Sequence, residues 1–217
     1  DLTPYLIAIA KENCTDGYII RAGDAVNFSI GQGDTLMTPI QMAVTYSAIA
    51  NGGTIWKPWI ARAILDPKGK VLKEFGPQKV GQSEQTKADT AFLRKALRAV
   101  TTSGTAAGVF SGFPVEVAGK TGTGQDLGRN KNGTAKDDTS WFASFAPASK
   151  PQYAVIMVVS QGGFGATTSA VGVRDIYAEI FGVTGGQIDP AKSAFPNGIP
   201  DGLPKLDVKN ATLDGTK

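Results

Sequence analysis

The chain has 217 residues, of which 41% are hydrophobic and 19% charged, values typical of one ordinary globular domain rather than a disordered chain. The net charge is only +3 and the lysines and arginines are scattered, so the sequence does not predict a nucleic-acid-binding protein. It contains no run of about 20 apolar residues, which excludes an ordinary membrane-spanning helix within these residues.

Two scarce residue types narrow the chemistry further. The chain has no histidine, so it cannot itself form a Ser-His-Asp or Cys-His catalytic arrangement or a histidine-based zinc site. Its single cysteine, Cys14, excludes an internal disulfide and a thiolate metal cluster. We therefore expect a plain unpaired thiol at Cys14, no metal and no cofactor.

The first elements in chain order are helices. Thr3 and Pro4 are typical of a helix start in the middle of a protein, so we expect the chain to be a piece of a longer one. Residues 13–24 are predicted to be a polar loop. The pair Thr38-Pro39 then predicts a capped helix, which should end at Asn51-Gly52-Gly53.

A hairpin and a second amphipathic helix follow. Residues 59–65 and 71–75 are predicted strands that turn at Asp66-Pro67-Lys68-Gly69, and residues 77–86 a polar connector. The helix is predicted over residues 88–101. Its inward face should comprise Phe92, Leu93, Ala96, Leu97 and Val100, and its solvated face Arg94, Lys95 and Arg98.

The stretch from Val115 to Gly124 is the candidate functional element. Its period-two alternation predicts a strand, and the glycines around Lys120-Thr121 would let another molecule approach the backbone closely. An edge strand of this kind can bind an extended peptide as one more strand. Lys120 would supply a cation and Thr121 and Thr123 two hydroxyl groups, which together suit a carboxylate. The alternative is a strand followed by a glycine-rich turn with a surface lysine.

The remaining elements predict the fold class. A long polar loop over residues 125–138 leads to strands at 139–145 and 153–161, the second apolar on both faces and therefore expected to be central. A helix is predicted from about Thr168 to Phe181, with Val171, Ile176 and Ile180 in the core. Three consecutive strands with short connections pair antiparallel, and with these helices they give an α+β fold. Residues 183–217 are expected to be an extended or poorly ordered tail rather than a second domain.

Five segments in order resemble a known family. They are Ser29-Ile30-Gly31-Gln32-Gly33, Thr38-Pro39-Ile40-Gln41-Met42-Ala43, Asn51-Gly52-Gly53, Ala118-Gly119-Lys120-Thr121-Gly122-Thr123 and Trp141-Phe142-Ala143-Ser144-Phe145-Ala146-Pro147. Together they resemble the C-terminal half of the transpeptidase domain of class B penicillin-binding proteins. The resemblance runs from about residue 24 to residue 182. It implies that residues 1–182 are the C-terminal part of a penicillin-binding/β-lactamase-like transpeptidase fold, incomplete without an upstream segment.

The resemblance also implies an activity and site residues. The family's motifs are Ser-x-x-Lys, Ser-x-Asn and Lys-Thr-Gly, with serine as the nucleophile. Carried onto this chain, Lys120, Thr121, Gly122 and Thr123 are the implied catalytic residues. Lys120 and Thr121 would orient the substrate, and Gly122 would leave it room. Thr123 would bind the terminal carboxylate through its hydroxyl and contribute its backbone N–H to the oxyanion hole.

The chain departs from the family pattern because it lacks the nucleophile. No serine has lysine three residues on: Ser83 precedes Lys87 by four residues, and Ser149 directly precedes Lys150. No serine has asparagine two residues on. The resemblance therefore implies that the upstream half of the domain carries Ser-x-x-Lys and Ser-x-Asn, and that this chain alone is inactive.

The implied substrates are peptidoglycan stem peptides ending in D-Ala-D-Ala, with β-lactam antibiotics as covalent inhibitors. The implied location is the extracytoplasmic face of the bacterial membrane, through an upstream anchor, beside a glycosyltransferase partner. Two alternatives stay open: a β-lactam sensor or degenerate non-catalytic module, and a D,D-carboxypeptidase or β-lactamase of the same fold. Gln32 and Gln41 belong to the shared segments, but a structural role is the expectation for both.

Overall fold

A computed structural model of the chain describes residues 3–16, 19–33, 35–126 and 128–196. The chain divides into two units, Asp1–Met37 and Thr38–Lys217. The first holds α1 (Thr3–Asp16) and α2 (Ala22–Ser29), so the loop expected over residues 13–24 is wrong at both ends. The start of α2 was not predicted because arginine is an unusual residue at the N-cap. Here the backbone N–H of Arg21 donates to the Asp24 carboxylate at 2.9 Å.

The second unit opens with α3 (Pro39–Asn51), which confirms the expected helix. Thr38 and Gln41 form a reciprocal cap: the Gln41 N–H donates to Thr38 Oγ1 at 3.3 Å, and the Thr38 N–H to Gln41 Oε1 at 2.8 Å. Gly52 ends the helix in the left-handed conformation, with φ of 85°. This cap gives Gln41 the structural role expected of it.

The centre of this unit is a three-stranded antiparallel sheet of β5 (Ala118–Gly124), β6 (Thr139–Ala146) and β7 (Tyr153–Val159), in that spatial order. The three expected strands and their antiparallel pairing are confirmed. The expectation that the last strand is central is wrong: within the part of the chain that the structure describes, β7 pairs with β6 alone. Its apolar side chains are half-buried on both faces because helices cover both sides.

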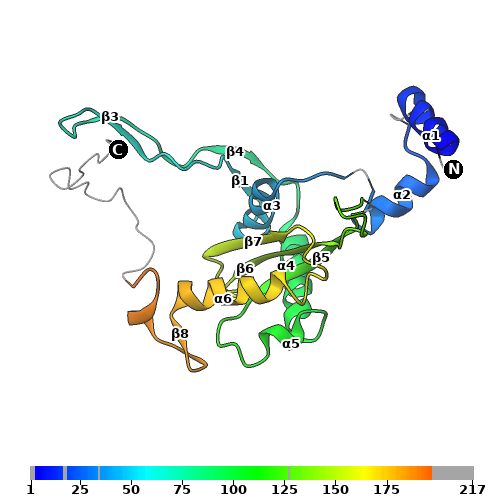
Figure 1. The fold of residues 1–217 in the computed structure, drawn as a ribbon. Helices are drawn as coiled ribbons and strands as arrows, with labels where there is room; N and C mark the ends of the chain where they lie inside the picture. Colours follow the sequence, from blue (N-terminus) through cyan, green and yellow to red (C-terminus); the bar gives the residue numbers. More distant parts are fainter. Residues whose placement is uncertain (1–2, 17–18, 34, 127, 197–217) are drawn as a thin grey trace. The chain divides into compact units, whose positions relative to one another are not determined.

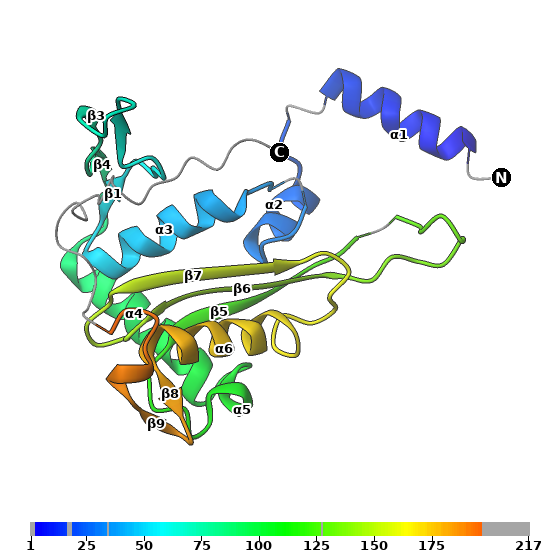
Figure 2. The same ribbon diagram turned by 60° about the vertical axis from the view of Figure 1, so that its left-hand side comes forward.

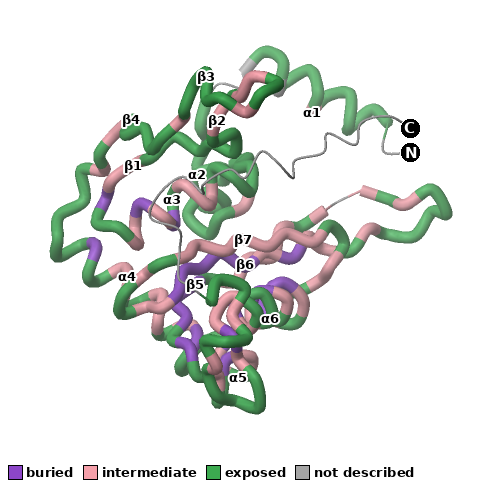
Figure 3. Tube along the Cα trace, turned by 90° about the vertical axis from the view of Figure 1, so that its left-hand side faces the viewer, coloured by how far each residue is buried: buried purple, intermediate pink, exposed green. Residues whose placement is uncertain are grey.

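Helices cover the two faces of the sheet, which is the α+β architecture that was predicted (Figure 1; Figure 2). α3 and α4 (Lys87–Thr102) pack on one face, around buried Tyr46, Ala118, Ala143 and Phe145. α5 (Ala107–Phe110) and α6 (Ser169–Phe181) pack on the other, in a larger cluster that includes Phe110, Phe142, Val173 and Tyr177. The buried residues gather on β5, β6 and the adjoining helices (Figure 3).

Two helix faces differ from expectation. Phe92 on α4 is 70% exposed, whereas Arg94 and Arg98 are half-buried and donate to backbone carbonyls, so neither arginine is simply solvated. On α6, Val171 and Ile176 are 40% and 41% exposed, whereas Val173 and Tyr177 are fully buried. In both helices the true core stripe is rotated from the one that hydrophobicity alone predicts.

A long antiparallel ribbon of residues 54–82, here called the arm, projects from the sheet region (Figure 1). Its base is β1 (Thr54–Trp56) paired with β4 (Lys79–Gln82), and its tip is β2 (Ala63–Leu65) paired with β3 (Val71–Glu74). The turn at Asp66 is confirmed, since its carboxylate accepts the N–H groups of Lys68 and Lys70 at 2.9 and 2.8 Å. β1 and β4, and the unpaired stretch before β2, were not predicted.

The segment after α6 was also mispredicted. Residues 183–196 contain a small hairpin, β8 (Val183–Thr184) with β9 (Gln187–Ile188), and a 3₁₀ helix, η1 (Pro190–Lys192). This segment returns to the domain: Ser193 Oγ donates to Ile180 O at 2.6 Å, and the Phe195 ring stacks on Tyr153 at 5.7 Å. Residues 197–217 of the expected tail lie outside the described residues.

Candidate active site

The candidate strand β5 lies at one edge of the sheet and carries all four predicted site residues. Among the described strands, its only neighbour is β6. Strand register pairs Lys120 with Ala143, Gly122 with Trp141 and Thr123 with Ser140. Its other edge is therefore open in the described structure, as strand addition by an extended peptide requires.

Strand alternation divides the four residues between the two faces of the sheet. Lys120 is exposed on the face of α3 and α4, where its Nζ donates to Thr121 O at 2.8 Å. Thr121 and Thr123 point to the face of α5 and α6. The structure thus brings the lysine and the hydroxyls to one edge but does not bring their side chains to one face.

The hydroxyls on that second face have protein partners. Thr121 Oγ1 hydrogen-bonds Thr105 Oγ1 at 2.9 Å, and Thr123 Oγ1 accepts the backbone N–H of Gly165 at 3.4 Å. These contacts fix the rotation of the strand about its own axis. A carboxylate that binds at the edge would meet a strand that is already oriented.

Two glycines of β5, Gly119 and Gly122, allow its close packing on β6. A Cβ at Gly119 would lie 2.7 Å from Ala143 O and 2.8 Å from the Phe142 ring, distances that side chains do not adopt. A Cβ at Gly122 would lie 3.0 Å from Trp141 Cβ. A larger residue at position 119 would therefore push β5 away from its neighbour, whereas one at position 122 would require a small shift of Trp141.

α4 and the turn that follows it anchor the start and middle of β5. Arg98 donates from Nη1 to Val117 O at 3.2 Å and to Thr101 Oγ1 at 2.9 Å, directly before the strand begins. Thr105, in the turn after α4, holds Thr121. The sequence marked this turn only as a helix break, because hydrogen bonds across sixteen or more residues leave no local pattern.

The loop between β7 and α6 anchors the end of β5. A Cβ at Gly165 would lie 2.5 Å from Gly122 O and 2.4 Å from Trp141 O, so only glycine allows the loop to rest directly on the strand backbone. The buried hydroxyls of Ser140 and Ser169 lie 2.8 Å apart and fasten α6 to β6 at the residue opposite Thr123. Sequence reasoning found none of these supporting residues.

The loop between β5 and β6 has internal order of its own. Lys136 Nζ lies 3.1 Å from Asp126 Oδ2, and the backbones of Arg129 and Ala135 form an isolated antiparallel β-bridge. The hydrogen bond from the Gly128 N–H lowers the pKa of the Asp126 carboxyl below its usual range, and the hydrogen bond from Lys136 lowers it further. This loop extends the two strands beyond the candidate residues, in keeping with the long polar loop that was predicted.

Among the described residues there is no group of three or more metal-ligating side chains. Over the same ranges, no helix is long and apolar enough to cross a membrane. Cys14 is an exposed free thiol, as expected. Trp141 is half-buried beside Gly122, and Phe142 is fully buried against Phe110.

Comparisons with known proteins identify the family of the chain. The family model "Penicillin binding protein transpeptidase domain" matches residues 11–181. Over 168 residues the chain is 31% identical to "Peptidoglycan D,D-transpeptidase PbpA" of Mycolicibacterium smegmatis, a match that covers 75% of the chain and 32% of that protein. The chain therefore spans about a third of the length of this relative.

Solved structures show the same fold. A Pseudomonas aeruginosa PBP2 bound to WCK 5153 has a TM-score of 0.64 at 27% identity, over 83% of this chain and 37% of that one. An imipenem acyl-enzyme complex of penicillin-binding protein A from M. tuberculosis has a TM-score of 0.58 at 25% identity, over 70% and 33%. A peptidoglycan synthase complex described as coordinating polymerization and crosslinking has a TM-score of 0.63 at 27% identity, over 82% and 29%. The motif-bearing edge strand, the helix-covered sheet and these matches lead to one conclusion: the chain belongs to the penicillin-binding protein transpeptidase family.

Proposed function

We propose that this chain supplies one wall of a serine-type D-Ala-D-Ala transpeptidase site that cross-links peptidoglycan stem peptides. The observation that carries the proposal is β5: an open-edged strand with Lys120, Thr121, Gly122 and Thr123 in family order, held by contacts at its start, middle and end. The nucleophile comes from polypeptide outside these 217 residues, because none of their serines has the Ser-x-x-Lys spacing. The chain alone is inactive.

The proposed reaction has two steps. The outside serine attacks the carbonyl carbon of the D-Ala-D-Ala bond; its proton passes to the departing amine, the C–N bond breaks, and free D-Ala leaves an acyl-serine. An amine of a neighbouring stem peptide then attacks this ester, forms the cross-link and returns the proton to the serine. The reaction uses side chains and backbone only, with no metal or cofactor.

The residues of β5 take distinct parts in these steps. Lys120 is exposed at the open edge, where its charge attracts and orients the substrate. The Thr123 backbone N–H donates to the oxyanion, and its hydroxyl and that of Thr121 bind the terminal carboxylate. Loss of one oxyanion donor in other enzymes slows reaction by about 100- to 1,000-fold, so the position of this strand governs rate as well as binding. We expect a β-lactam to acylate the same serine, and the imipenem acyl-enzyme complex of the mycobacterial neighbour supports acylation by this class of inhibitor.

The proposed setting is the extracytoplasmic face of the bacterial membrane. An upstream segment would anchor the protein there, beside a glycosyltransferase that supplies new strands. The support for this partner is the fold shared with a peptidoglycan synthase complex that couples polymerization and crosslinking.

The products of the reaction distinguish the proposal from its rivals. We expect the assembled protein, in which these 217 residues follow a Ser-x-x-Lys segment, to convert D-Ala-D-Ala stem peptides plus an amine acceptor into cross-linked dimer and free D-Ala. Mass spectrometry of the products checks this. Free D-Ala without dimer would indicate a carboxypeptidase, rapid hydrolysis of penicillin a β-lactamase, and stable acylation without turnover of peptide a sensor; each would contradict transpeptidation.

A further inference from the structure

The two sides of the arm separate in its middle, here called the waist (residues 57–62 and 75–78), because two prolines interrupt the strand pairing. Between the base and tip ladders, residues 57–62 face residues 75–78 without forming strands. Pro58 and Pro77 have no N–H to donate across the ribbon. The opening is closed at both ends by backbone hydrogen bonds, from Lys57 N to Gln78 O and from Phe75 N to Arg62 O, each 2.8 Å.

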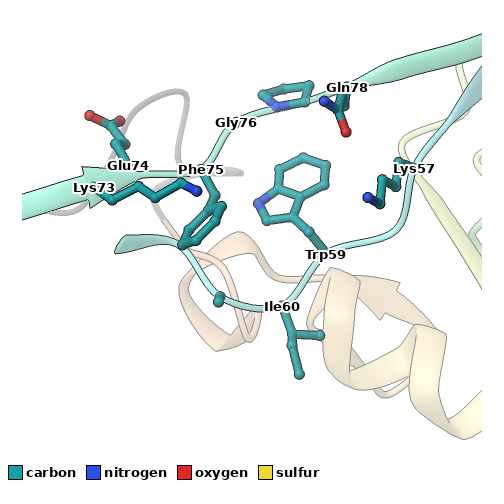
Figure 4. A pocket seen from close by; sticks show the side chains of 10 residues that line it. Lys57, Trp59, Ile60, Lys73, Glu74, Phe75, Gly76 and Gln78 are labelled. Atoms are coloured by element: carbon teal, nitrogen blue, oxygen red, sulfur yellow. The ribbon is translucent and has the colours of Figure 1, made fainter. Parts of the chain in front are cut away.

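This opening forms a cleft of about 650 Å³. That volume lies within the range of small-molecule sites, which is roughly 300–1,000 Å³. Trp59 stands in the middle of it, between Phe75 on one side and Lys57 and Gln78 on the other (Figure 4). Trp59 is 45% exposed, and Lys73 Nζ lies 5.1 Å from the Phe75 ring centre, so the cleft combines aromatic faces with cations.

The arm concentrates the positive charge of the chain. Residues 54–82 hold six lysines and arginines and two acidic residues, a net charge of +4, whereas the rest of the chain sums to −1. Of the two acidic residues, Glu74 lines the cleft but points away from Trp59 (Figure 4). The surface therefore favours an anionic ligand that also presents flat, weakly polar faces to an indole.

We propose that the cleft at the arm's waist, built around Trp59, is a non-catalytic binding site for an uncross-linked peptidoglycan strand. The sugar rings present C–H faces that stack on Trp59 and Phe75, the Gln78 amide hydrogen-bonds their hydroxyl and acetamido groups, and Lys57 and Lys73 meet the carboxylates of the stem peptides. The choice of this strand rests on the proposed function, whereas the aromatic and basic character of the cleft does not. Such a site would bind the glycan of a nascent strand while β5 binds its stem peptides for cross-linking.

The test measures binding of soluble uncross-linked peptidoglycan strands to the 217-residue chain by calorimetry. Trp59→Ala should weaken binding by about tenfold or more, as loss of an aromatic anchor does, and Trp59→Phe by no more than about threefold. The double variant Lys57→Glu/Lys73→Glu should weaken binding and reduce its salt dependence. Lys95→Glu, an exposed charge reversal on α4, is the matched control and should bind as the parent does. Far-ultraviolet circular dichroism confirms that each variant is folded.

Competing ligands separate this proposal from other anionic partners. Strands whose carboxylates have been amidated should bind more weakly than untreated strands. Unchanged binding by Trp59→Ala would overturn the proposal. Poly-L-glutamate or phosphatidylglycerol vesicles that bind as tightly as the strands, with the same dependence on Trp59, would also overturn it. Because no acylation is measured, failure here leaves the transpeptidase proposal standing, and failure of cross-linking leaves this binding result standing.

Discussion

Lys120→Ala in the assembled protein is expected to slow acylation by a fluorescent penicillin by roughly 100- to 1,000-fold, the usual cost of losing a fixed electrostatic contact to the reacting group. The fold should be unaffected. The side chain is exposed, and within the part of the chain that the structure describes its hydrogen bond is to Thr121 O, so the free energy of unfolding should change by no more than about 0.5 kcal/mol. Stopped-flow labelling and urea unfolding measure the two quantities separately.

Two further variants sharpen this prediction. Lys120→Arg keeps the charge on a bulkier head group and should fall between the parent and the alanine variant. Lys150→Ala removes another exposed lysine, from the loop between β6 and β7, and should label at the parental rate. Parental labelling by Lys120→Ala would refute the role given to this lysine.

Gly165→Ala is the second substitution with a large expected effect, and it acts through the support of β5. The added Cβ would lie 2.5 Å from Gly122 O and 2.4 Å from Trp141 O, and backbone atoms in a sheet cannot easily yield. We expect a loss of about 1–3 kcal/mol in the free energy of unfolding, the usual cost of overpacking. The loop should lift from the strand and release the contact between Gly165 N–H and Thr123, so acylation should slow as well.

The matched control for Gly165→Ala is Gly108→Ala. Gly108 lies in α5, and a Cβ there would meet nothing within 4 Å, so this change should be neutral or slightly stabilising. Urea unfolding with parallel penicillin labelling tests the pair. If Gly165→Ala matched Gly108→Ala in both stability and labelling, the loop would have no role in holding β5.

The sequence predicted those parts of the fold whose signals are local. Thr38 and Gly52 fix the ends of α3 by capping, and alternation placed the three strands of the sheet to within a few residues. The core stripes of α4 and α6 were partly wrong because partners distant in sequence choose the buried face. Arg98, a charged residue, is half-buried because its guanidinium donates to the Val117 carbonyl, which also accepts a hydrogen bond from Thr101 Oγ1.

In the candidate site, too, the sequence predicted the local motif but not the contacts between residues distant in sequence. Lys120 to Thr123 could be located because glycine, lysine and threonine follow one another in a short motif. The sequence could not reveal that Lys120 and the two hydroxyls occupy opposite faces of one edge, with Thr105 and Gly165 behind the hydroxyls. Nor could it show the cleft at Trp59, because prolines in facing segments become meaningful only once the two segments pair across the arm.

Covalent labelling by a fluorescent penicillin, compared between the 217-residue chain alone and the assembled protein that also contains the Ser-x-x-Lys segment, decides whether the nucleophile lies outside these residues. We expect the assembled protein to label through that serine and the chain alone not to label. Stoichiometric labelling of the chain alone would contradict this expectation, because the nucleophile would then lie among these 217 residues.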